Sequence, residues 1–139
     1  EHLDEYFAAC DRLLVPGGRM ALQAITMNDA HFDYYVRAVD FIQKYVFPGS
    51  CLLSVRAMRK TLLRTSLSIE SCLDIGQHYP PTLQAWRRNV EANRVEIRAL
   101  GYGGRFERLW DYYLAYCEAG FAERFISDIQ VLLTKSVRS

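Results

Sequence analysis

The stretch DIGQHYPPTLQAW, residues 74–86, combines turn-forming residues with side chains that could do chemistry. It carries a glycine, a His-Tyr pair and two prolines in one short connection. A phenol that faces a dry pocket can donate a hydrogen bond to an anion, while its ring face favours a nearby cation. On composition alone, the commoner arrangement is a Tyr79 ring packed under the loop with its hydroxyl in water. We expect His78 to point away from Tyr79, because neighbouring side chains alternate in an extended segment.

Gln23 is a second candidate, because it lies within the mostly apolar run RMALQAIT, residues 19–26. A buried amide needs a hydrogen-bond partner. Gln23 could therefore be a core amide satisfied by its neighbours or a group that holds a ligand, and the sequence leaves these two alternatives even.

The four cysteines predict neither a zinc site nor a cysteine nucleophile. Cys10, Cys51, Cys72 and Cys117 are far apart, with no CxxC or HxxxH spacing. Isolated cysteines of this kind are typical of buried thiols in a reducing compartment. A nucleophilic cysteine needs a base beside it, and no His-Cys arrangement is evident at Cys117.

Length and composition indicate one globular domain. The chain has 139 residues, of which 50% are hydrophobic and 24% are charged, as in folded proteins. Its formal net charge of +1 gives no argument for a nucleic-acid partner, which usually requires a clearly basic domain. No apolar run is long enough to span a bilayer, and no signal peptide is visible.

The apolar periodicity predicts an α/β chain in the order helix, strand, helical insertion, strand, two helices and a strand. We expect a helix at residues 3–14, a Pro-Gly-Gly turn, and a strand at 19–26 with both faces buried. The further elements are expected at 30–47 (Phe32, Tyr35, Val39 and Ile42 on one helical face), 54–64 (helix), 66–76 (strand), 82–100 (helix capped by Thr82, with Leu83, Trp86, Val90, Ile97 and Leu100 inward), 106–121 (helix) and 127–135 (strand). Since the chain opens on a helix with no preceding strand, we expect it to be the later part of a larger domain.

Several segments, taken together, resemble the C-terminal part of cyclopropane-fatty-acyl-phospholipid synthases, which are S-adenosylmethionine-dependent methyltransferases related to the mycolic acid cyclopropane synthases. They read, in order, YFAACDRLLVPGGRMALQAIT, DFIQKYVFPGSCLLS, DIGQHYPPTLQAW and LWDYYLAYCEAGF followed by ISDIQVLLTK. The resemblance implies the C-terminal half of a Rossmann-like class I methyltransferase sheet, with its last three strands and an antiparallel final strand at 127–135. Residues 28–65 would form a helical lid over the lipid.

The cofactor-binding part of the family is not found in this sequence. The family holds S-adenosylmethionine with a Gly-rich loop after a strand, whereas GYGG at 101–104 follows an expected helix. We therefore expect this chain to be inactive by itself and to lack a cofactor-binding residue of its own.

The resemblance implies transfer of a methyl group to the cis double bond of a phospholipid acyl chain. A base then removes a proton from the added methyl group so that a cyclopropane ring closes, and in the family this base resembles a bound bicarbonate. Tyr79 matches the family's bicarbonate-binding tyrosine. Gln23 and Ile25 complete the implied catalytic set, and the well-studied bacterial enzymes have a histidine at the position of Gln23.

The resemblance also implies which helix face contacts the acyl chain. Tyr113, Cys117 and Phe121 follow helical spacing within residues 106–121, and the family places this face against the acyl pocket. Packing in the core is the alternative, most of all for Phe121.

Partners and competing functions follow from the same observations. Arg56, Lys60 and Arg64 recur every four residues and could meet an anionic membrane surface, although a solvated helix face is the commoner arrangement. A homodimer and a cytoplasmic location, at times at the inner face of the membrane, are the expected setting. The alternatives are a related methyltransferase that acts on an amine and a non-catalytic lipid-binding module.

Overall fold

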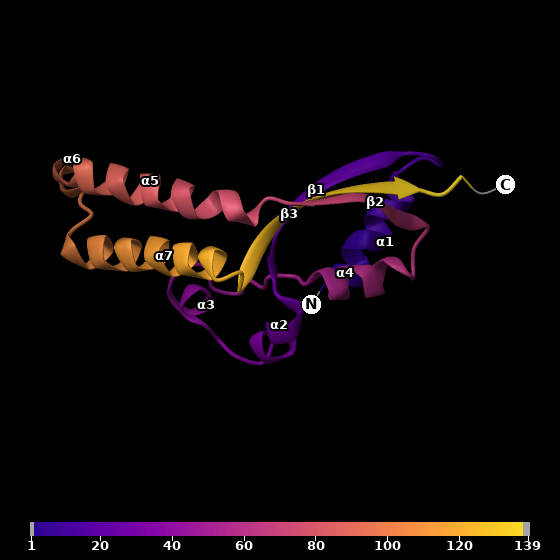
Figure 1. Cartoon of the computed structure of the whole chain (residues 1–139), viewed down its shortest axis with the longest axis horizontal. Helices are drawn as coiled ribbons and strands as arrows, with labels where there is room; N and C mark the ends of the chain where they lie inside the picture. The colour runs from indigo at the N-terminus through magenta and orange to yellow at the C-terminus, as the bar shows by residue number, and fades with distance from the viewer. Residues whose placement is uncertain (1, 138–139) are drawn as a thin grey trace.

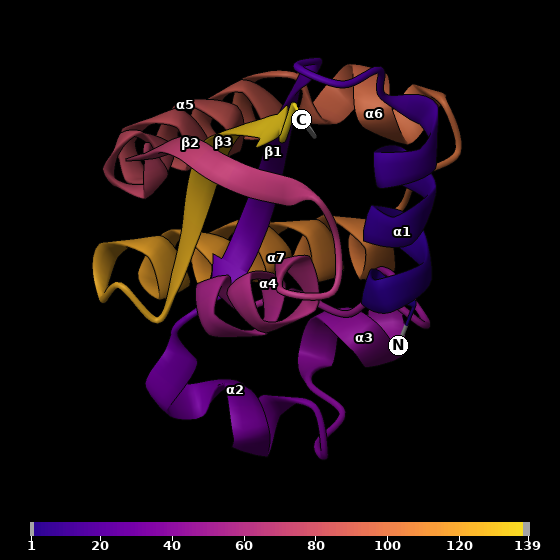
Figure 2. The ribbon, with the colours of Figure 1, turned by 90° about the vertical axis from the view of Figure 1, so that its right-hand side faces the viewer.

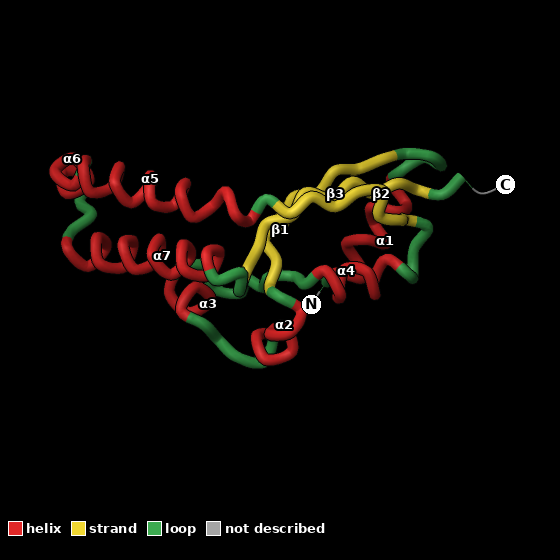
Figure 3. The backbone as a smooth tube through the Cα atoms, in the orientation of Figure 1, coloured by secondary structure: helices red, strands yellow, loops and turns green. Residues whose placement is uncertain are grey.

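The computed structural model describes residues 2–137 and has the predicted α/β order. Its elements are α1 (Leu3–Leu13), β1 (Arg19–Met27), α2 (Asp29–Tyr35), α3 (Phe41–Tyr45), α4 (Val55–Leu62), β2 (Leu67–Asp74), the short 3-10 helix η1 (Gly76–His78), α5 (Tyr79–Ala92), α6 (Arg94–Ala99), α7 (Gly104–Ala122) and β3 (Ile126–Lys135). Figure 3 shows how helices and strands alternate along the tube. The predicted strands and the predicted helices at 3–14, 54–64 and 106–121 are confirmed.

The three strands form one sheet in the order β1-β3-β2. β3 lies between the other two and is antiparallel to both, so the predicted antiparallel final strand is confirmed. In the register of β1 and β3, Gln23 lies opposite Gln130 and Ile25 lies opposite Asp128. Side chains of directly opposed residues stand on the same face of a sheet, which brings these four residues together.

Helices α1 and α4 cover one face of the sheet (Figures 1 and 2). Phe7 of α1 and Met58 of α4 are fully buried there against Ile129, Val131 and Leu133 of β3. These apolar contacts form the main core, because burial of aliphatic and aromatic side chains is the dominant stabilising contribution.

The opposite face of β1 is open within the described part of the chain. Arg19, Ala21, Gln23 and Ile25 are exposed, whereas the residues between them are more buried. The prediction that both faces of residues 19–26 are buried is therefore wrong for this structure. The reason is that helices cover only one face of β1, the face that packs against α1 and α4.

Helices α5 and α7 form a long hairpin that projects from the end of the sheet, with α6 at its tip (Figure 1). Leu83 of α5 and Leu114, Cys117 and Phe121 of α7 make a second apolar cluster. This hairpin carries most of the residues predicted to bind substrate.

Two helix predictions are corrected. Residues 30–47 form α2 and α3 instead of one helix, because Asp40 and Gln43 make a capping box that starts α3, and Val39 is 74% exposed. The helix predicted at 82–100 begins at Tyr79 and ends at Ala92. Pro80 and Pro81 fit its first turn, where a backbone N–H has no partner within the helix.

Only some of the residues expected to face inward along this helix are buried. Leu83 is buried, as predicted, but Trp86 is 50% exposed and Leu100 is 76% exposed. Thr82 does not cap the helix, because its hydroxyl instead donates to the carbonyl oxygen of His78.

Candidate active site

The turn after β2 is held by hydrogen bonds to β3 and α7. Asp74 accepts from the Gly76 N–H at 2.9 Å and from the Ser127 hydroxyl. The Ile75 N–H donates to the Asp128 carbonyl oxygen at 2.8 Å. Gln77 donates from Nε2 to the Phe121 carbonyl oxygen at 3.1 Å. Because three anchors converge on these few residues, the position of Tyr79 directly after them is well defined.

Gly76 is required by the close approach of this turn to β3. A Cβ atom at Gly76 would collide with the Ser127 hydroxyl and would lie 3.0 Å from Cα of Ser127. Since Cα belongs to the backbone, a side chain at this position would move the turn itself. The connection between β2 and α5 therefore needs a glycine at this point.

Tyr79 places its ring in the hairpin core and its hydroxyl toward the sheet. The ring stacks on Phe121 with centroids 4.4 Å apart and an interplanar angle of 15°. Interaction with the Asp128 carboxylate raises the pKa of the Tyr79 hydroxyl, burial raises it further, and Gln23 lowers it. Tyr79 is therefore a neutral hydrogen-bond donor at neutral pH. The structure brings Tyr79 and Gln23 together, as the predicted site requires.

His78 lies outside this group. It is exposed and belongs to η1. The argument from an extended segment does not apply to it, because residues 76–79 are helical in conformation. The turn, and not strand-like alternation, separates His78 from Tyr79.

A chain of amides leads to a buried carboxylate that the sequence analysis missed. Gln130 donates from Nε2 to Oε1 of Gln23 at 3.0 Å, and Gln23 donates from Nε2 to Oδ2 of Asp128 at 2.8 Å. Asp128 is 1% exposed. Its other oxygen, Oδ1, is buried and has no hydrogen-bond partner within residues 2–137. A hydrogen bond with the Asp128 side chain is the main cause of the raised pKa of Tyr79, although no well-aligned donor within residues 2–137 reaches Oδ1.

The signal for Asp128 was present in the sequence. Along β3, Ile129, Val131 and Leu133 face the main core, so Asp128 and Gln130 must share the other face with Gln23. Asp128 is the second residue of the predicted strand 127–135, and an acidic residue that is buried in a strand needs a hydrogen-bond partner. Ile25, the third residue of the predicted catalytic set, lies opposite Asp128 and is 39% exposed.

Tyr113, Cys117 and Phe121 lie in or against the contact between α5 and α7. Burial raises the pKa of Tyr113 to about 12, with a further contribution from Cys117. Burial also raises the pKa of the Cys117 thiol to about 11. A neutral, buried thiol is a poor nucleophile.

An apolar cavity of about 410 Å³ lies beside a neighbouring face of α7. Its lining includes Tyr34 and Tyr35 of α2, Ile42 of α3, and Tyr116, Ala119 and Gly120 of α7. Residues 28–65 thus contribute walls to an apolar space, while the predicted trio on α7 lies one helix face away from it.

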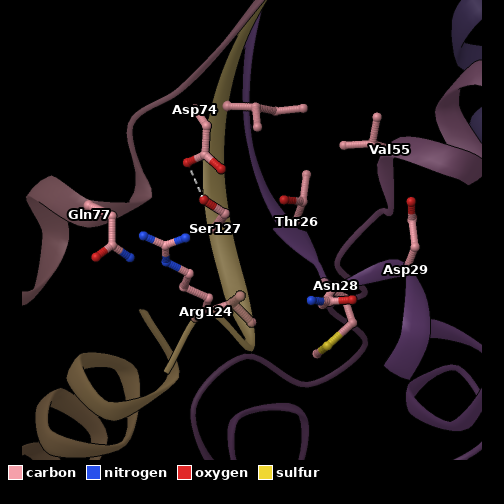
Figure 4. A pocket seen from close by; sticks show the side chains of 11 residues that line it. Thr26, Asn28, Asp29, Val55, Asp74, Gln77, Arg124 and Ser127 are labelled. Carbon is pink, nitrogen blue, oxygen red and sulfur yellow. Dashed lines mark hydrogen bonds between the residues drawn. The ribbon is translucent and has the colours of Figure 1, made fainter. Parts of the chain in front are cut away.

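A polar cleft of about 520 Å³ lies where β1 and β2 end and β3 begins (Figure 4). Thr26, Asp74, Gln77 and Ser127 line it together with Arg124, whose backbone is left-handed with φ of 56°. In Figure 4 the Arg124 side chain extends toward Ser127 and Gln77. The cleft therefore lies at the carboxyl ends of β1 and β2, where open α/β sheets commonly bind ligands.

The basic residues of α4 are partly neutralised. Arg56 pairs with Asp33 at 3.2 Å and donates to the Asp29 carbonyl oxygen, and Arg64 pairs with Asp4. Of the three basic residues predicted to meet an anionic surface, Arg56 and Arg64 are thus paired with acidic side chains, which lowers the net positive charge of this face. Within residues 2–137 no helix is both long enough and apolar enough to cross a bilayer.

Solved structures share this fold. Cyclopropane synthase MmaA2 from Mycobacterium tuberculosis matches 96% of this chain with a TM-score of 0.85 and 22% identity. Mycolic acid cyclopropane synthase CmaA1, solved in complex with SAH and CTAB, matches 96% of it with a TM-score of 0.83 and 23% identity. In each case the match covers 50% of the other chain. The fold is therefore the C-terminal part of a class I methyltransferase.

Relatives in sequence identify the family within this fold class. Tuberculostearic acid methyltransferase UfaA1 of M. tuberculosis is 38% identical over 94% of this chain and 31% of its own length. Cyclopropane-fatty-acyl-phospholipid synthase of Escherichia coli K12 is 34% identical over 100% of this chain and 35% of its own length. The chain thus spans about a third of these relatives. The profile of the mycolic acid cyclopropane synthetase family matches residues 1–131, and the chain belongs to this family.

Proposed function

We propose that this chain is the substrate half of an S-adenosylmethionine-dependent methyltransferase that methylates the cis double bond of an unsaturated phospholipid acyl chain and closes a cyclopropane ring. The observation that carries the proposal is the meeting of Tyr79, Gln23 and Asp128 near the beginning of β3. Ile126, which packs against the same apolar cluster as Tyr79, lines the apolar cavity together with Gly120. An apolar space beside a small polar group suits a hydrocarbon chain with one reactive bond.

S-adenosylmethionine supplies the methyl group when it is bound. Residues 2–137 contain no Gly-rich loop between a strand and a helix, since Gly101 and Gly103 lie between α6 and α7 and Gly104 is the first residue of α7. We assign cofactor binding to the part of the longer relatives that this chain does not match. The exposed face of β1 offers a surface on which that part would dock.

The residues of this chain would act on the acceptor lipid. An alkene is a weak nucleophile, so positioning and exclusion of water must supply much of the rate. The cavity walls from α2, α3 and α7 would hold the acyl chain, with Tyr113, Cys117 and Phe121 supporting the α7 wall from behind. The neutral Tyr79 hydroxyl would present its oxygen to the cationic intermediate.

Relatives differ in the acceptor that their names state. Sphingolipid C9-methyltransferase A of Emericella nidulans is 32% identical over 99% of this chain. The apolar lining of the cavity supports a lipid acceptor over an amine. A transient contact with an anionic membrane surface stays a prediction, and the ion pairs of Arg56 and Arg64 reduce the charge available for it.

The test is methyl transfer by a protein that joins this chain to a cofactor-binding segment of the family. Vesicles of unsaturated phospholipid would be incubated with S-adenosylmethionine labelled in the methyl group, and the lipids analysed by mass spectrometry. We expect acyl chains that carry the label in a ring. Saturated phospholipid is the matched control and should stay unlabelled. Label that appears only in an amine acceptor, or in no lipid at all, would contradict the proposal.

A further inference from the structure

We propose, on the basis of the function above, that Asp128 is the proton acceptor of this site and takes the place of a bound bicarbonate. The proposal comes from the position of its carboxylate beside Gln23 and Tyr79. It makes the base a permanent part of the chain instead of an exchangeable anion.

The other groups of the site do not suit the task. The Gln23 side chain is a neutral amide that cannot accept a proton from carbon. The Tyr79 phenol is held neutral by the adjacent Asp128 carboxylate, and a neutral phenol is a poor base. His78 is exposed on η1. Among the residues that the structure brings to this point, the Asp128 carboxylate is the base that remains.

Gln23 engages one of the two oxygens of the Asp128 carboxylate. Oδ2 accepts from Nε2 of Gln23 at 2.8 Å. Gln23 is itself oriented by Gln130, whose Nε2 donates to its Oε1 at 3.0 Å. Oδ1 is buried with no partner in the described residues. Buried polar atoms are nearly always hydrogen-bonded, so an orphaned carboxylate oxygen calls for a functional explanation.

The Asp128 carboxylate disfavours the binding of bicarbonate beside it. A bicarbonate held by Tyr79 and Gln23 would lie next to the buried Asp128 side chain. Two negative charges in direct contact disfavour each other. The residues present therefore do not fit a bound bicarbonate, and the implied anion site is already filled by the chain.

The proposed step balances in atoms and charge. Methyl transfer to one alkene carbon leaves a cation on its neighbour and converts the sulfonium to a neutral thioether. Oδ1 of Asp128 then takes a proton from the added methyl group, and the electron pair of that C–H bond closes the ring. The carboxylate becomes a neutral carboxylic acid, which loses its proton to water after the product leaves.

The first experiment separates methyl transfer from ring closure in the active protein described above. Asp128→Asn keeps the shape of the side chain and removes the base. We expect ring formation to fall on the order of 10²-fold or more, with release of the demethylated cofactor reduced much less. Asp111→Asn, a surface change at the pair with Arg87, is the matched control and should retain the wild-type rate. Wild-type activity should be insensitive to removal of bicarbonate and carbon dioxide.

The second experiment does not depend on activity. Binding of ¹³C-labelled bicarbonate to this chain would be followed by line broadening in NMR spectra. We expect no binding at Tyr79 in the wild type, and binding only after Asp128→Asn. Broadening in the wild type that disappears in Tyr79→Phe would overturn the proposal, as would an Asp128→Asn protein that closes rings at the wild-type rate. A wild-type protein that methylates no lipid would contradict the proposed function. The bicarbonate-binding measurement would still decide whether Asp128 occupies the anion site.

Discussion

At the scale of single residues, the site depends on side chains that each make one apolar contact and one polar contact. Tyr79 stacks its ring on Phe121 and turns its hydroxyl toward Gln23 and Asp128. Cys117 packs in the hairpin core and shares a hydrogen bond with Tyr113. Changes that keep the apolar contact and alter the polar one can therefore separate stability from chemistry.

Tyr79→Phe removes only the hydroxyl. Since the ring contact with Phe121 stays, we expect the free energy of unfolding to change by about 1 kcal/mol or less. In an active protein that contains this chain, we expect kcat to fall while KM for lipid changes little, because the hydroxyl acts on the intermediate and not on the acyl chain. Steady-state kinetics with unsaturated phospholipid measure this split. Kinetics equal to wild type would remove Tyr79 from the mechanism.

Cys117 predicts a loss of stability in alkaline solution. Burial raises its pKa from 9.0 to about 11, so the folded state favours the neutral thiol. Its contribution is complete below pH 9 and is lost as the pH rises toward 11, and it amounts to about 3 kcal/mol.

Urea unfolding at a series of pH values measures this contribution. The wild type should lose more stability between pH 9 and 11 than Cys117→Ala, whatever the starting stability of the variant. Equal slopes for the two proteins would contradict the buried neutral thiol. Cys72→Ala, at an exposed cysteine, is the control and should follow the wild-type slope.

At the scale of elements, η1 is the piece that positions the site. Its hydrogen bonds run to β3 and to the end of α7, so it joins the sheet to the helical hairpin. Tyr79 is the first residue of α5. Any movement of η1 against β3 moves the hydroxyl of Tyr79 away from Asp128.

Gly76→Ala tests this arrangement. The added Cβ meets Ser127 within 3.0 Å of its backbone, so we expect a loss of about 2 kcal/mol in the free energy of unfolding. We also expect a change in the near-ultraviolet circular dichroism of the stacked Tyr79 and Phe121 rings. Gly104→Ala is the matched control, because its nearest neighbour is the flexible end of Arg108 at 3.5 Å. A Gly76→Ala protein as stable as the control would show that the turn can yield.

At the scale of the whole molecule, the chain consists of a sheet covered on one face and a hairpin that projects from its end (Figure 1). β3 is paired on both sides, whereas β1 is paired on one side within residues 2–137. The exposed face of β1 carries Gln23 and Ile25, which belong to the predicted catalytic set. The molecule therefore presents part of its candidate site on an open surface.

Hydrogen exchange should show this asymmetry. Along β1, backbone N–H groups that point to β3 should be protected, and the alternate N–H groups that point away should exchange fast. Along β3, protection should be continuous from Ile129 to Leu133, because both neighbours are in place. Exchange measured residue by residue with NMR distinguishes the two patterns. Continuous protection of β1 in this chain would mean that a further strand, such as that of a second copy, covers its edge.

The sequence by itself determined the order of elements, whereas the antiparallel last strand and a shared site of Tyr79 and Gln23 were expected from the family resemblance. The spacing of apolar residues in a helix or a strand is a local property of the sequence. The pattern of apolar residues alone therefore locates α4, α7 and β3. The motif around Tyr79 could be matched for the same reason. These features depend on residues close together in the chain.

Only the tertiary structure decided which faces are covered and which polar groups meet. Gln23 and Asp128 are separated by 105 positions in the chain, and no local pattern states that they share a hydrogen bond. Whether β1 has one covered face or two depends on which helices pack against it, which its own residues do not specify. Burial and electrostatic environment arise from segments that are distant in sequence, and for that reason the burial of Asp128 and its hydrogen bond with Gln23 are evident only in the folded chain.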